Sequence, residues 1–358
     1  MTINNEHNKL NVPNLRFPEF QGEWITYKIK DVLSIGNGRD YKHLSNGEIP
    51  VFGTGGYMTS VDECLYDGET TFIGRKGSIN KPFYYNGKFW TVDTLFYTHS
   101  FNGITPKFTY CLFQTINWLK YNEASGVPSL SKDTIEKIKI KIPGLEEQNK
   151  IAKLMFALDV RITTQNKIID KLQSLIKGIS SRIFTSIQGI EYRMGDIVTI
   201  TNGNSNVQDA VTQSKDGLYP FFDRSEDIKY LPTFLFDKEA IIYPGEGTEF
   251  MPRYFKGKFA LHQRCYAIFD FNEIINARFL YFYLKTRNSY FVKNAVGSTV
   301  PSLRLDTFQK LKVIIPSKKI QHSVSLCLSS MEQKCNVEKK ILHKLLKQKQ
   351  YLLRQMFI

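Results

Sequence analysis

The chain has few cysteines, and no two of them form a recognisable motif. Only five of its 358 residues are cysteine, and no two stand in a CxxC arrangement. An odd number of scattered cysteines argues against a disulfide framework and against a zinc site. We therefore expect a fold held by hydrophobic cores, and a chain of this length can supply two of them.

Long hydrophobic runs are missing as well. No apolar stretch approaches the roughly 18 residues of a membrane-spanning helix. Residues 1–14 are polar and rich in asparagine, and they lack the hydrophobic segment of a signal peptide. These absences favour a cytoplasmic protein that does not enter a membrane.

The motifs of common catalytic sites are also absent. The sequence has no GxxxxGK[ST] phosphate loop, no HExxH and no GxSxG. Gly53–Gly56 and Gly74–Gly77 are glycine-rich turns without the spacing of a phosphate loop, and Lys81–Tyr84 lacks the first residue of an amino-methyltransferase tetrapeptide. We expect no catalytic residues, no metal and no cofactor in this chain.

The composition is that of a globular protein with a basic surface. Hydrophobic residues make up 42% of the chain and charged residues 23%, which excludes a disordered protein. The 48 Lys+Arg and 34 Asp+Glu give a formal net charge of +14. Such an excess favours a polyanionic partner, most simply nucleic acid, although a protein can be basic without binding one.

A long internal repeat organises the sequence. The segment VPSLSKDTIEKIKIKIP at Val127–Pro143 recurs as VPSLRLDTFQKLKVIIP at Val300–Pro316. The offset of 173 residues continues without a gap to Phe184 and Phe357. A weaker similarity precedes it, because Pro82, Tyr84, Gly87, Lys88 and Phe89 match Pro252, Tyr254, Gly257, Lys258 and Phe259. The chain is therefore two copies of one unit, each a variable module followed by a shared tail.

The variable modules have the pattern of short strands joined by tight turns. Asn-Gly pairs such as Asn37-Gly38 and Asn202-Gly203 separate aromatic and β-branched runs. We expect those aromatic residues to form cores rather than to stack on bases. One helix is predicted in each module, beginning at Thr105-Pro106 and at Asn276.

After Pro143 and Pro316 the hydrophobic period becomes helical. Apolar residues recur in steps of four and three, which predicts two long helices with heptad seams. A helix over residues 146–184 would be about 58 Å long. Polar residues interrupt the seams at Gln165, Glu338 and Lys349. The expected helix-pairing positions are Leu158, Ile162, Ile169, Leu172, Ile176 and Ile179 in the first helix, and Met331, Cys335, Leu342, Leu345 and Leu352 in the second.

Burying the two seams against each other gives the simplest fold. We expect an α+β protein with two tandem β-rich domains, separated by a long antiparallel two-helix coiled coil with pseudo-two-fold symmetry. The alternative is that the two helices belong separately to the core of one compact domain.

The net charge lies in the repeated tails. Residues 127–184 carry 11 basic and 6 acidic residues, and residues 300–357 carry 12 and 3. The rest of the chain has 25 of each sign and is neutral. The tails would thus supply salt-sensitive attraction to DNA or to acidic protein partners, and the modules would rely on local loop geometry.

Two such modules, each followed by a PSL segment, an Ile-Pro end and a long helix, resemble the specificity (S) subunits of type I restriction–modification systems. The resemblance rests on Val127–Leu130, Lys139–Pro143 and Glu147-Gln148, on their counterparts in the second copy, and on the N-terminal Pro13–Phe20 followed by Trp24. One departure is Ile320, which stands where the first copy has Glu147.

The resemblance implies a non-catalytic DNA-recognition subunit. Each module would be a target recognition domain that reads one half of a bipartite, asymmetric site in double-stranded DNA. The paired helices would set the gap and hold two modification subunits, which bind S-adenosylmethionine and methylate adenine. Restriction subunits that use ATP and Mg would join them. The corresponding division is residues 1–143 and 190–316 for the recognition domains, and 144–189 and 317–358 for the spacer helices.

The candidate DNA-binding residues are basic or amide side chains near glycine-bearing turns, since these suit phosphates and base edges. Ser129 and Ser302, with Arg304, would position phosphate near the entry to each tail. The full set is Arg39, Lys42, Arg75, Lys76, Ser129, Asn204, Asn206, Arg224, Arg253, Arg264, Ser302 and Arg304.

Two other classes of protein stay open at this point. The chain could be a stand-alone DNA-modifying or DNA-cleaving enzyme with an unrecognised site, in which case it would act on DNA without partners. It could also be a coiled-coil scaffold with no DNA role, in which case scrambling either half of a bipartite duplex would not affect binding.

Overall fold

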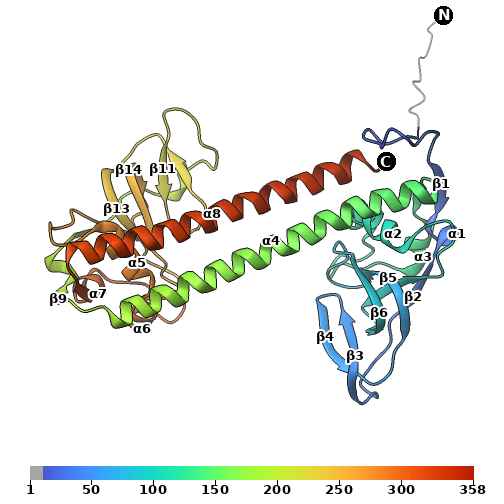
Figure 1. Cartoon of the computed structure of the whole chain (residues 1–358), viewed down its shortest axis with the longest axis horizontal. Helices are drawn as coiled ribbons and strands as arrows, with labels where there is room; N and C mark the ends of the chain where they lie inside the picture. Colours follow the sequence, from blue (N-terminus) through green and yellow to red (C-terminus); the bar gives the residue numbers. More distant parts are fainter. Residues whose placement is uncertain (1–10) are drawn as a thin grey trace, which may run out of the picture. The chain divides into compact units, whose positions relative to one another are not determined.

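The computed structural model describes residues 11–358 (Figure 1). Residues 1–10, which include most of the polar N-terminal segment that favoured a cytoplasmic protein, lie outside the described part. The chain divides into two compact units, one of residues 1–166 and 341–358 and the other of residues 167–340. Each unit contains one module, the end of one long helix and the beginning of the other.

The two modules share one topology. Each has a six-stranded sheet, with the orders β2-β7-β5-β6-β3-β4 and β10-β15-β13-β14-β11-β12. The strands of the first sheet are β2 (Ser34–Asn37), β3 (Asn46–Gly53), β4 (Gly56–Val61), β5 (Tyr66–Gly74), β6 (Phe83–Thr91) and β7 (Leu95–His99). Those of the second are β10 (Thr199–Asn202), β11 (Tyr219–Phe222), β12 (Lys229–Leu231), β13 (Phe236–Pro244), β14 (Arg253–Leu261) and β15 (Cys265–Phe269).

A two-stranded ribbon closes each module where it meets its tail. In the first unit β1 (Ile25–Lys28) pairs antiparallel with β8 (Lys139–Ile142), and in the second β9 (Ile190–Arg193) pairs with β16 (Lys312–Ile315). The repeated Ile-Pro segment is therefore the last strand of the module. Short helices complete the modules: α1 (Ile29–Val32), α2 (Pro106–Phe113) and α3 (Lys132–Lys137) in the first, and α5 (Ala277–Lys285), α6 (Asn288–Asn294) and α7 (Leu305–Gln309) in the second.

Local capping residues start the main helix of each module. The Thr105 side chain accepts a hydrogen bond from the backbone N–H of Phe108 and begins α2, with Pro106 at its first position. The Asn276 side chain accepts from the backbone N–H of Phe279 and begins α5. Both predicted helix starts are confirmed.

The long helices are α4 (Leu145–Ser186), of 42 residues, and α8 (Lys318–Gln355), of 38 residues. In the first unit, Met155 of α4 and Met356, the residue after the end of α8, join the core that contains Trp24 and Phe108. In the second unit, Phe184 of α4 and Leu328 of α8 join the core around Phe279. Within each unit the two helices therefore run in opposite directions.

Contacts and sequence divide the helices differently. The sequence-based division treats residues 144–189 and 317–358 as spacer segments, whereas the compact units split each helix between them. The reason is that each end of a helix packs into the core of the module beside it.

The seam positions are mostly buried or half-buried. Leu158, Ile169, Cys335 and Leu345 are buried, as is Gln165. Ile162, Leu172, Ile176, Met331, Leu342 and Leu352 are half-buried. Ile179 is more exposed than the other seam positions, at 36%, and the neighbouring Ser180 is buried. A straight helix has 3.6 residues per turn, so its buried stripe drifts away from a strict heptad.

One glutamine in each copy holds the start of a long helix to its module. Gln148 Oε1 accepts from the Thr105 N–H at 2.9 Å, and its Nε2 donates to the carbonyls of Gly103 and Pro143 at 2.9 Å. Gln321 makes the same three hydrogen bonds, to Asn276 N–H (2.7 Å) and to the carbonyls of Ile274 and Pro316 (2.9 Å each). The match of these two residues in the repeat therefore has a structural cause.

Replacing Gln321 by alanine is expected to destabilise the second unit. The Gln321 side chain is buried, and its loss leaves one N–H and two carbonyl groups without that partner. Each unsatisfied buried group costs about 1–3 kcal/mol, so we expect a loss of roughly 3 kcal/mol in the free energy of unfolding. Urea denaturation measures it. Gln348→Ala, at an exposed position of α8, is the control and should change the free energy of unfolding by less than about 0.5 kcal/mol. An equal loss in both variants would contradict a stabilising role for the Gln321 hydrogen bonds.

Candidate nucleic-acid interface

Loops of the first module gather where three of its strands begin or end. Asn37 pairs with Phe96 and Gly74 pairs with Leu95, so the loops after β2 and β5 leave the sheet beside the start of β7. The backbone N–H of Arg39 donates to the Thr91 carbonyl at 2.7 Å. We name residues 37–42, 74–79, 91–95 and 127–130 the first loop cluster.

The repeated tail segment completes this cluster. Lys76 and Ser129 form an isolated antiparallel bridge. The Gly77 N–H donates to the Pro128 carbonyl at 2.8 Å, and the Leu130 N–H donates to the Arg75 carbonyl at 2.9 Å. The PSL segment therefore fixes the backbone of the loop that carries two of the predicted basic residues.

All five candidate residues of the first module lie in segments of the first loop cluster. The backbone N–H groups of Arg39 and Arg75 both donate to carbonyls of residues 91–95, and the bridge between Lys76 and Ser129 joins the tail segment to the same loops. Lys42 lies further along the loop after β2, where its N–H faces the Asp40 carboxylate at 3.4 Å. The side chains of Arg39, Lys42, Arg75 and Lys76 are exposed. Within residues 11–358 none of these four side chains forms an ion pair. They are therefore available to contact DNA phosphates or base acceptors.

Glycine is required where the loop after β2 folds back. A Cβ at Gly38 would lie 1.9 Å from the Val92 carbonyl oxygen, and a Cβ at Gly36 would lie 2.2 Å from the Tyr97 ring. Gly203 has the same role in the second module, where a Cβ would lie 2.0 Å from the Leu261 carbonyl oxygen. The Asn-Gly turns are thus close backbone approaches that place the residues after them at the loop cluster.

The second module has an equivalent group of residues around a pocket of about 510 Å³, and we name the residues that line this pocket the second loop cluster. The predicted residues Arg224 and Arg264 line it. Glu246 forms an antiparallel bridge with Ser302, as Lys76 does with Ser129. The pocket residues are Val207, Asp223, Arg224, Ser225, Lys229, Glu246, His262, Gln263, Arg264 and Cys265.

The other candidates of the second module lie around this pocket or further away. Asn204 precedes Ser205, whose carbonyl accepts from the Gln263 N–H at 3.2 Å. Asn206 and Arg304 are exposed, just before a short 3-10 helix and before α7. No hydrogen bond connects Arg304 to the pocket within residues 11–358.

The Arg253 guanidinium is committed to backbone carbonyls of the protein. Its Nη2 donates to the Asp223 carbonyl, Nη1 lies 3.5 Å from the Glu226 carbonyl, and the group lies 5.3 Å from the centre of the Phe222 ring. Burial lowers the pKa of Arg253, with nearby acidic groups opposing the shift. This arginine therefore holds the loop that carries Arg224.

The pocket brings charges of both signs together. Burial opposes ionisation of Asp223, but hydrogen bonds from Lys229 and Ser225 outweigh burial, so the pKa of Asp223 lies below its ordinary value. Burial lowers the pKa of His262, which keeps the ring neutral at pH 7. Its Nδ1 accepts from the Arg264 N–H at 3.2 Å, so Nε2 is left as a donor.

Eight of the ten pocket residues were not among the candidates from the sequence, and Glu246, His262 and Lys229 are three of these eight. The signal that finds Glu246 is the 170-residue offset of the weaker repeat, which aligns Lys76 with Glu246.

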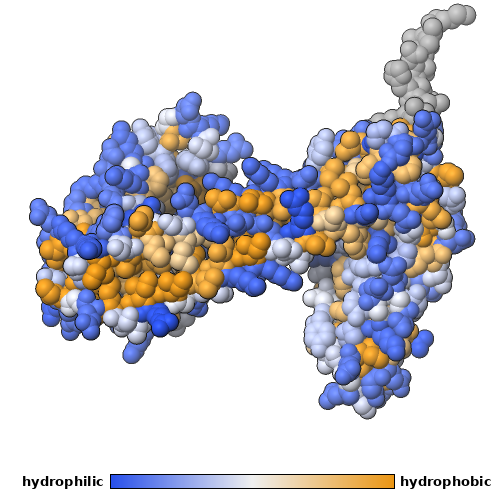
Figure 2. Space-filling model, viewed as in Figure 1, coloured by the Kyte–Doolittle hydropathy of each residue, from blue (hydrophilic) through white to orange (hydrophobic). Residues whose placement is uncertain are grey.

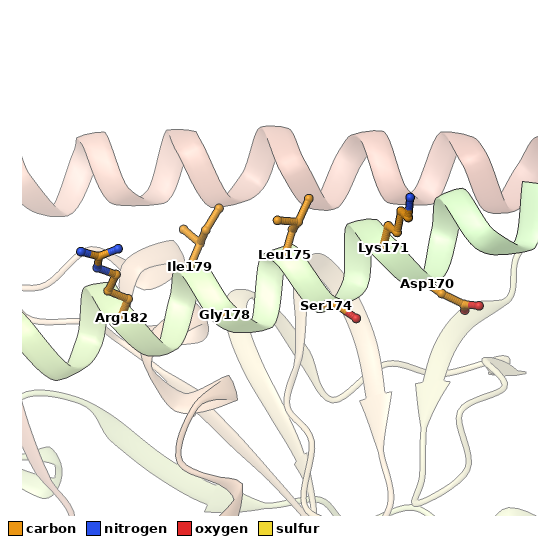
Figure 3. Close-up of a pocket in the computed structure, with 7 residues that line it drawn as sticks. All are labelled: Asp170, Lys171, Ser174, Leu175, Gly178, Ile179 and Arg182. Atoms are coloured by element: carbon orange, nitrogen blue, oxygen red, sulfur yellow. The ribbon is translucent and has the colours of Figure 1, made fainter.

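The long helices carry a different kind of surface. In the second unit, Leu175 is 54% exposed and Ile179 is 36% exposed. They point to the same side of α4 and line a shallow pocket of about 660 Å³ with Asp170, Lys171, Ser174, Gly178 and Arg182 (Figure 3). Apolar residues follow the surface of this part of α4 (Figure 2).

Other types of site find no support in the described part of the chain. Residues 11–358 contain no group of three or more His, Cys, Asp or Glu side chains placed to hold a metal ion. None of the helices there is long and apolar enough to cross a membrane.

The sequence matches one protein family twice. Residues 21–174 and 190–347 each match the type I restriction modification DNA specificity domain. The chain belongs to this family. The two matches cover both modules and most of both long helices, so the repeat is a tandem pair of specificity domains.

Curated relatives carry consistent names. The chain is 29% identical over 138 residues to the type I restriction enzyme EcoDI specificity subunit of Escherichia coli, which is 38% of this chain and 30% of that protein. It is 30% identical over 146 residues, 37% of this chain and 47% of the other, to a putative type I specificity subunit of Mycoplasma pneumoniae. The matched stretches thus span less than half the length of these relatives.

Solved structures share the specificity-domain fold over nearly the whole chain. The S subunit of a type I restriction-modification system from M. genitalium superposes with a TM-score of 0.74 at 17% identity, over 97% of this chain and 99% of that one. A structure described as showing complex assembly and conformational transition of the type I R-M system gives a TM-score of 0.53 at 13% identity, over 93% and 97%. The expected fold class is confirmed: two tandem domains with sheets, and two long helices.

Proposed function

We propose that this chain is the DNA-recognition subunit of a type I restriction–modification system. Each specificity domain would read one half of a bipartite, asymmetric site in double-stranded DNA. The observation that carries the proposal is the pair of loop clusters, which have one backbone frame but different exposed side chains. A shared frame with different reading groups is what two unlike half-sites require.

The candidate residues take roles according to their placement. Arg39, Arg75 and Lys76 would contact phosphates or base acceptors from the first cluster, and Arg224 and Arg264 from the second. Lys42, Asn204, Asn206 and Arg304 would contact DNA at the margins. Ser129 and Ser302 would position the loops, as would Arg253.

The paired helices would set the gap between half-sites and dock the partner subunits. Half-sites on one face of B-DNA lie about 34–36 Å apart per helical turn, a distance within the length of a helix of 42 residues. The exposed Leu175 and Ile179, flanked by Lys171 and Arg182, suit a modification subunit with an apolar, acidic face.

The chemistry would then reside in the partners. Two modification subunits would bind S-adenosylmethionine and methylate adenine after flipping it out of the duplex. Restriction subunits would use ATP and Mg. The chain itself would hold no cofactor and would act in the cytoplasm, with residues 1–143 and 190–316 as recognition domains and 144–189 and 317–358 as spacers.

Exchanging residues 191–316 for the recognition domain of another specificity subunit is expected to change one half-site only. The reason is that the second loop cluster is built within residues 190–316, apart from the helices. Genome-wide mapping of methylated adenines in cells that carry the whole system measures the outcome. The reciprocal exchange of residues 25–142 is the matched control and should change the other half. Alteration of both halves by one exchange would contradict the division of labour.

The rival functions have distinct outcomes in binding and activity assays. A purified chain that methylates or cuts DNA without partners would establish a stand-alone enzyme. A chain whose binding to a bipartite duplex is unaffected by scrambling either half would establish a scaffold without a recognition role.

A further inference from the structure

The turn after β5 and the turn after β13 have the same backbone. The Gly77 N–H donates to the Pro128 carbonyl at 2.8 Å, and the Gly247 N–H donates to the Pro301 carbonyl at 3.0 Å. Lys76 bridges Ser129 in the first turn, and Glu246 bridges Ser302 in the second. Lys76 and Glu246 therefore occupy one position in two copies of the same frame.

The side chains at this position have opposite charge. The first turn carries Arg75 and Lys76, and the second carries Gly245 and Glu246. Gly245 leaves no room for an arginine, because a Cβ there would lie 2.1 Å from the Arg264 carbonyl oxygen. A reversal of charge at a fixed backbone position is expected where two domains must accept different chemical groups.

Glu246 is held in place by an arginine from the neighbouring loop. Arg264 Nη1 donates to the two carboxylate oxygens of Glu246 at 2.8 and 3.1 Å. The Arg264 side chain is 62% exposed and that of Glu246 is 20% exposed. The pair lines the 510 Å³ pocket, and the carboxylate is the more deeply placed partner.

The major groove offers groups that match this pair. Cytosine presents an N4 amino donor and guanine presents the O6 and N7 acceptors, side by side in one base pair. A carboxylate accepts from cytosine N4, and an arginine donates to guanine. The arginine also offsets the repulsion between a carboxylate and the DNA phosphates, which an unpaired glutamate would feel.

We propose that Glu246 and Arg264 together select a cytosine–guanine pair in the half-site read by the second domain. At the equivalent position of the first domain, Arg75 and Lys76 donate to a guanine. This inference rests on the proposed function and deepens it, since it assigns one base pair to a named pair of side chains.

The test is adenine-methylation mapping in cells that carry the whole system with Glu246→Gln. The amide keeps the shape of the side chain but replaces one acceptor oxygen by a donor, so discrimination for cytosine should fall about 10- to 100-fold at one position of one half-site. The other half-site should stay unchanged. Glu249→Gln, which removes an exposed carboxylate from the same loop, is the matched control and should leave both halves as they are.

A second variant and a melting curve keep the outcome decisive. Lys76→Gln should relax one position in the opposite half-site only. Thermal unfolding of each purified full chain checks that these exposed or half-buried positions have not destabilised the fold. An unchanged site in a folded Glu246→Gln chain, or a second half-site without a cytosine–guanine pair, would overturn the inference while leaving the proposed function intact. A wild-type system that marks no bipartite site would overturn both.

Discussion

Inserting seven residues after Gln165 and seven after Glu338 is expected to lengthen the gap between the half-sites by about three base pairs. A heptad adds about 10.5 Å to an α-helix, and B-DNA rises 3.4 Å per base pair. Both positions lie on the predicted seams, and a heptad changes the angular register of a helix by only about 20°. The measurement is adenine-methylation mapping, which reads the gap directly from the marked sites.

The insertion sites also follow from how the chain divides. Contacts separate the two compact units between residues 166 and 167 and between residues 340 and 341, so both insertions fall next to a boundary and outside the module cores. The control is the same insertion in one helix only, which sets the two seams out of register and should abolish recognition. An unchanged gap after the double insertion would show that the helices do not set the distance between the half-sites.

The parts of the fold that were predictable have local signals. Thr105 and Asn276 are side chains that cap a helix within three residues, and the long helices repeat an apolar pattern over many turns. Along α4 the less exposed positions step from Ile176 to Ser180 and leave Ile179 exposed, because 3.6 residues per turn drift away from a strict heptad. Periodicity thus predicts the existence of a long helix better than which residue faces its neighbour.

The parts of the site that were not predictable depend on contacts distant in sequence. A search for donors and amides finds Arg75 and Arg264 but passes over Glu246, whose importance comes from its bridge to Ser302 and its pairing with Arg264. The same limit applies to Arg253, which has the composition of a DNA contact but donates to backbone carbonyls 27 and 30 residues away. Spacing alone does not separate a basic residue that reads DNA from one that holds a loop.

The second copy has Ile320 where the first has Glu147, and contacts with residues distant in sequence explain this difference. Glu147 is 3% exposed and receives two hydrogen bonds from Arg16, at 2.8 and 2.7 Å, as well as the Trp24 indole N–H at 3.4 Å. Arg16 belongs to the segment before β1. The second module follows α4 directly, so it has no such segment, and Ile320 is 45% exposed.

Replacing Arg16 by leucine is therefore expected to destabilise the first unit strongly. Removing one partner of a buried ion pair leaves the other charge uncompensated and costs about 3–5 kcal/mol. The hydrogen bond from Arg16 to Glu147 raises the pKa of the guanidinium, so Arg16 stays charged at neutral pH. Urea unfolding of the full chain measures the loss, and Arg161→Leu, at an exposed position of α4, should cost less than about 0.5 kcal/mol.

The double variant Arg16→Leu with Glu147→Gln distinguishes an uncompensated charge from lost packing. Glutamine removes the charge but keeps an acceptor for the Trp24 indole N–H, so the double variant should regain at least half of the stability lost by Arg16→Leu alone. Burying a neutral amide without its partner costs far less free energy than burying an unpaired carboxylate. If the double variant is no more stable than the single one, then the Arg16 side chain acts through its other contacts, which include hydrogen bonds to the Gln21 and Gly22 carbonyls, rather than by neutralising Glu147. The second copy, with Ile320 at the equivalent position, shows that the start of the long helix can form without this carboxylate.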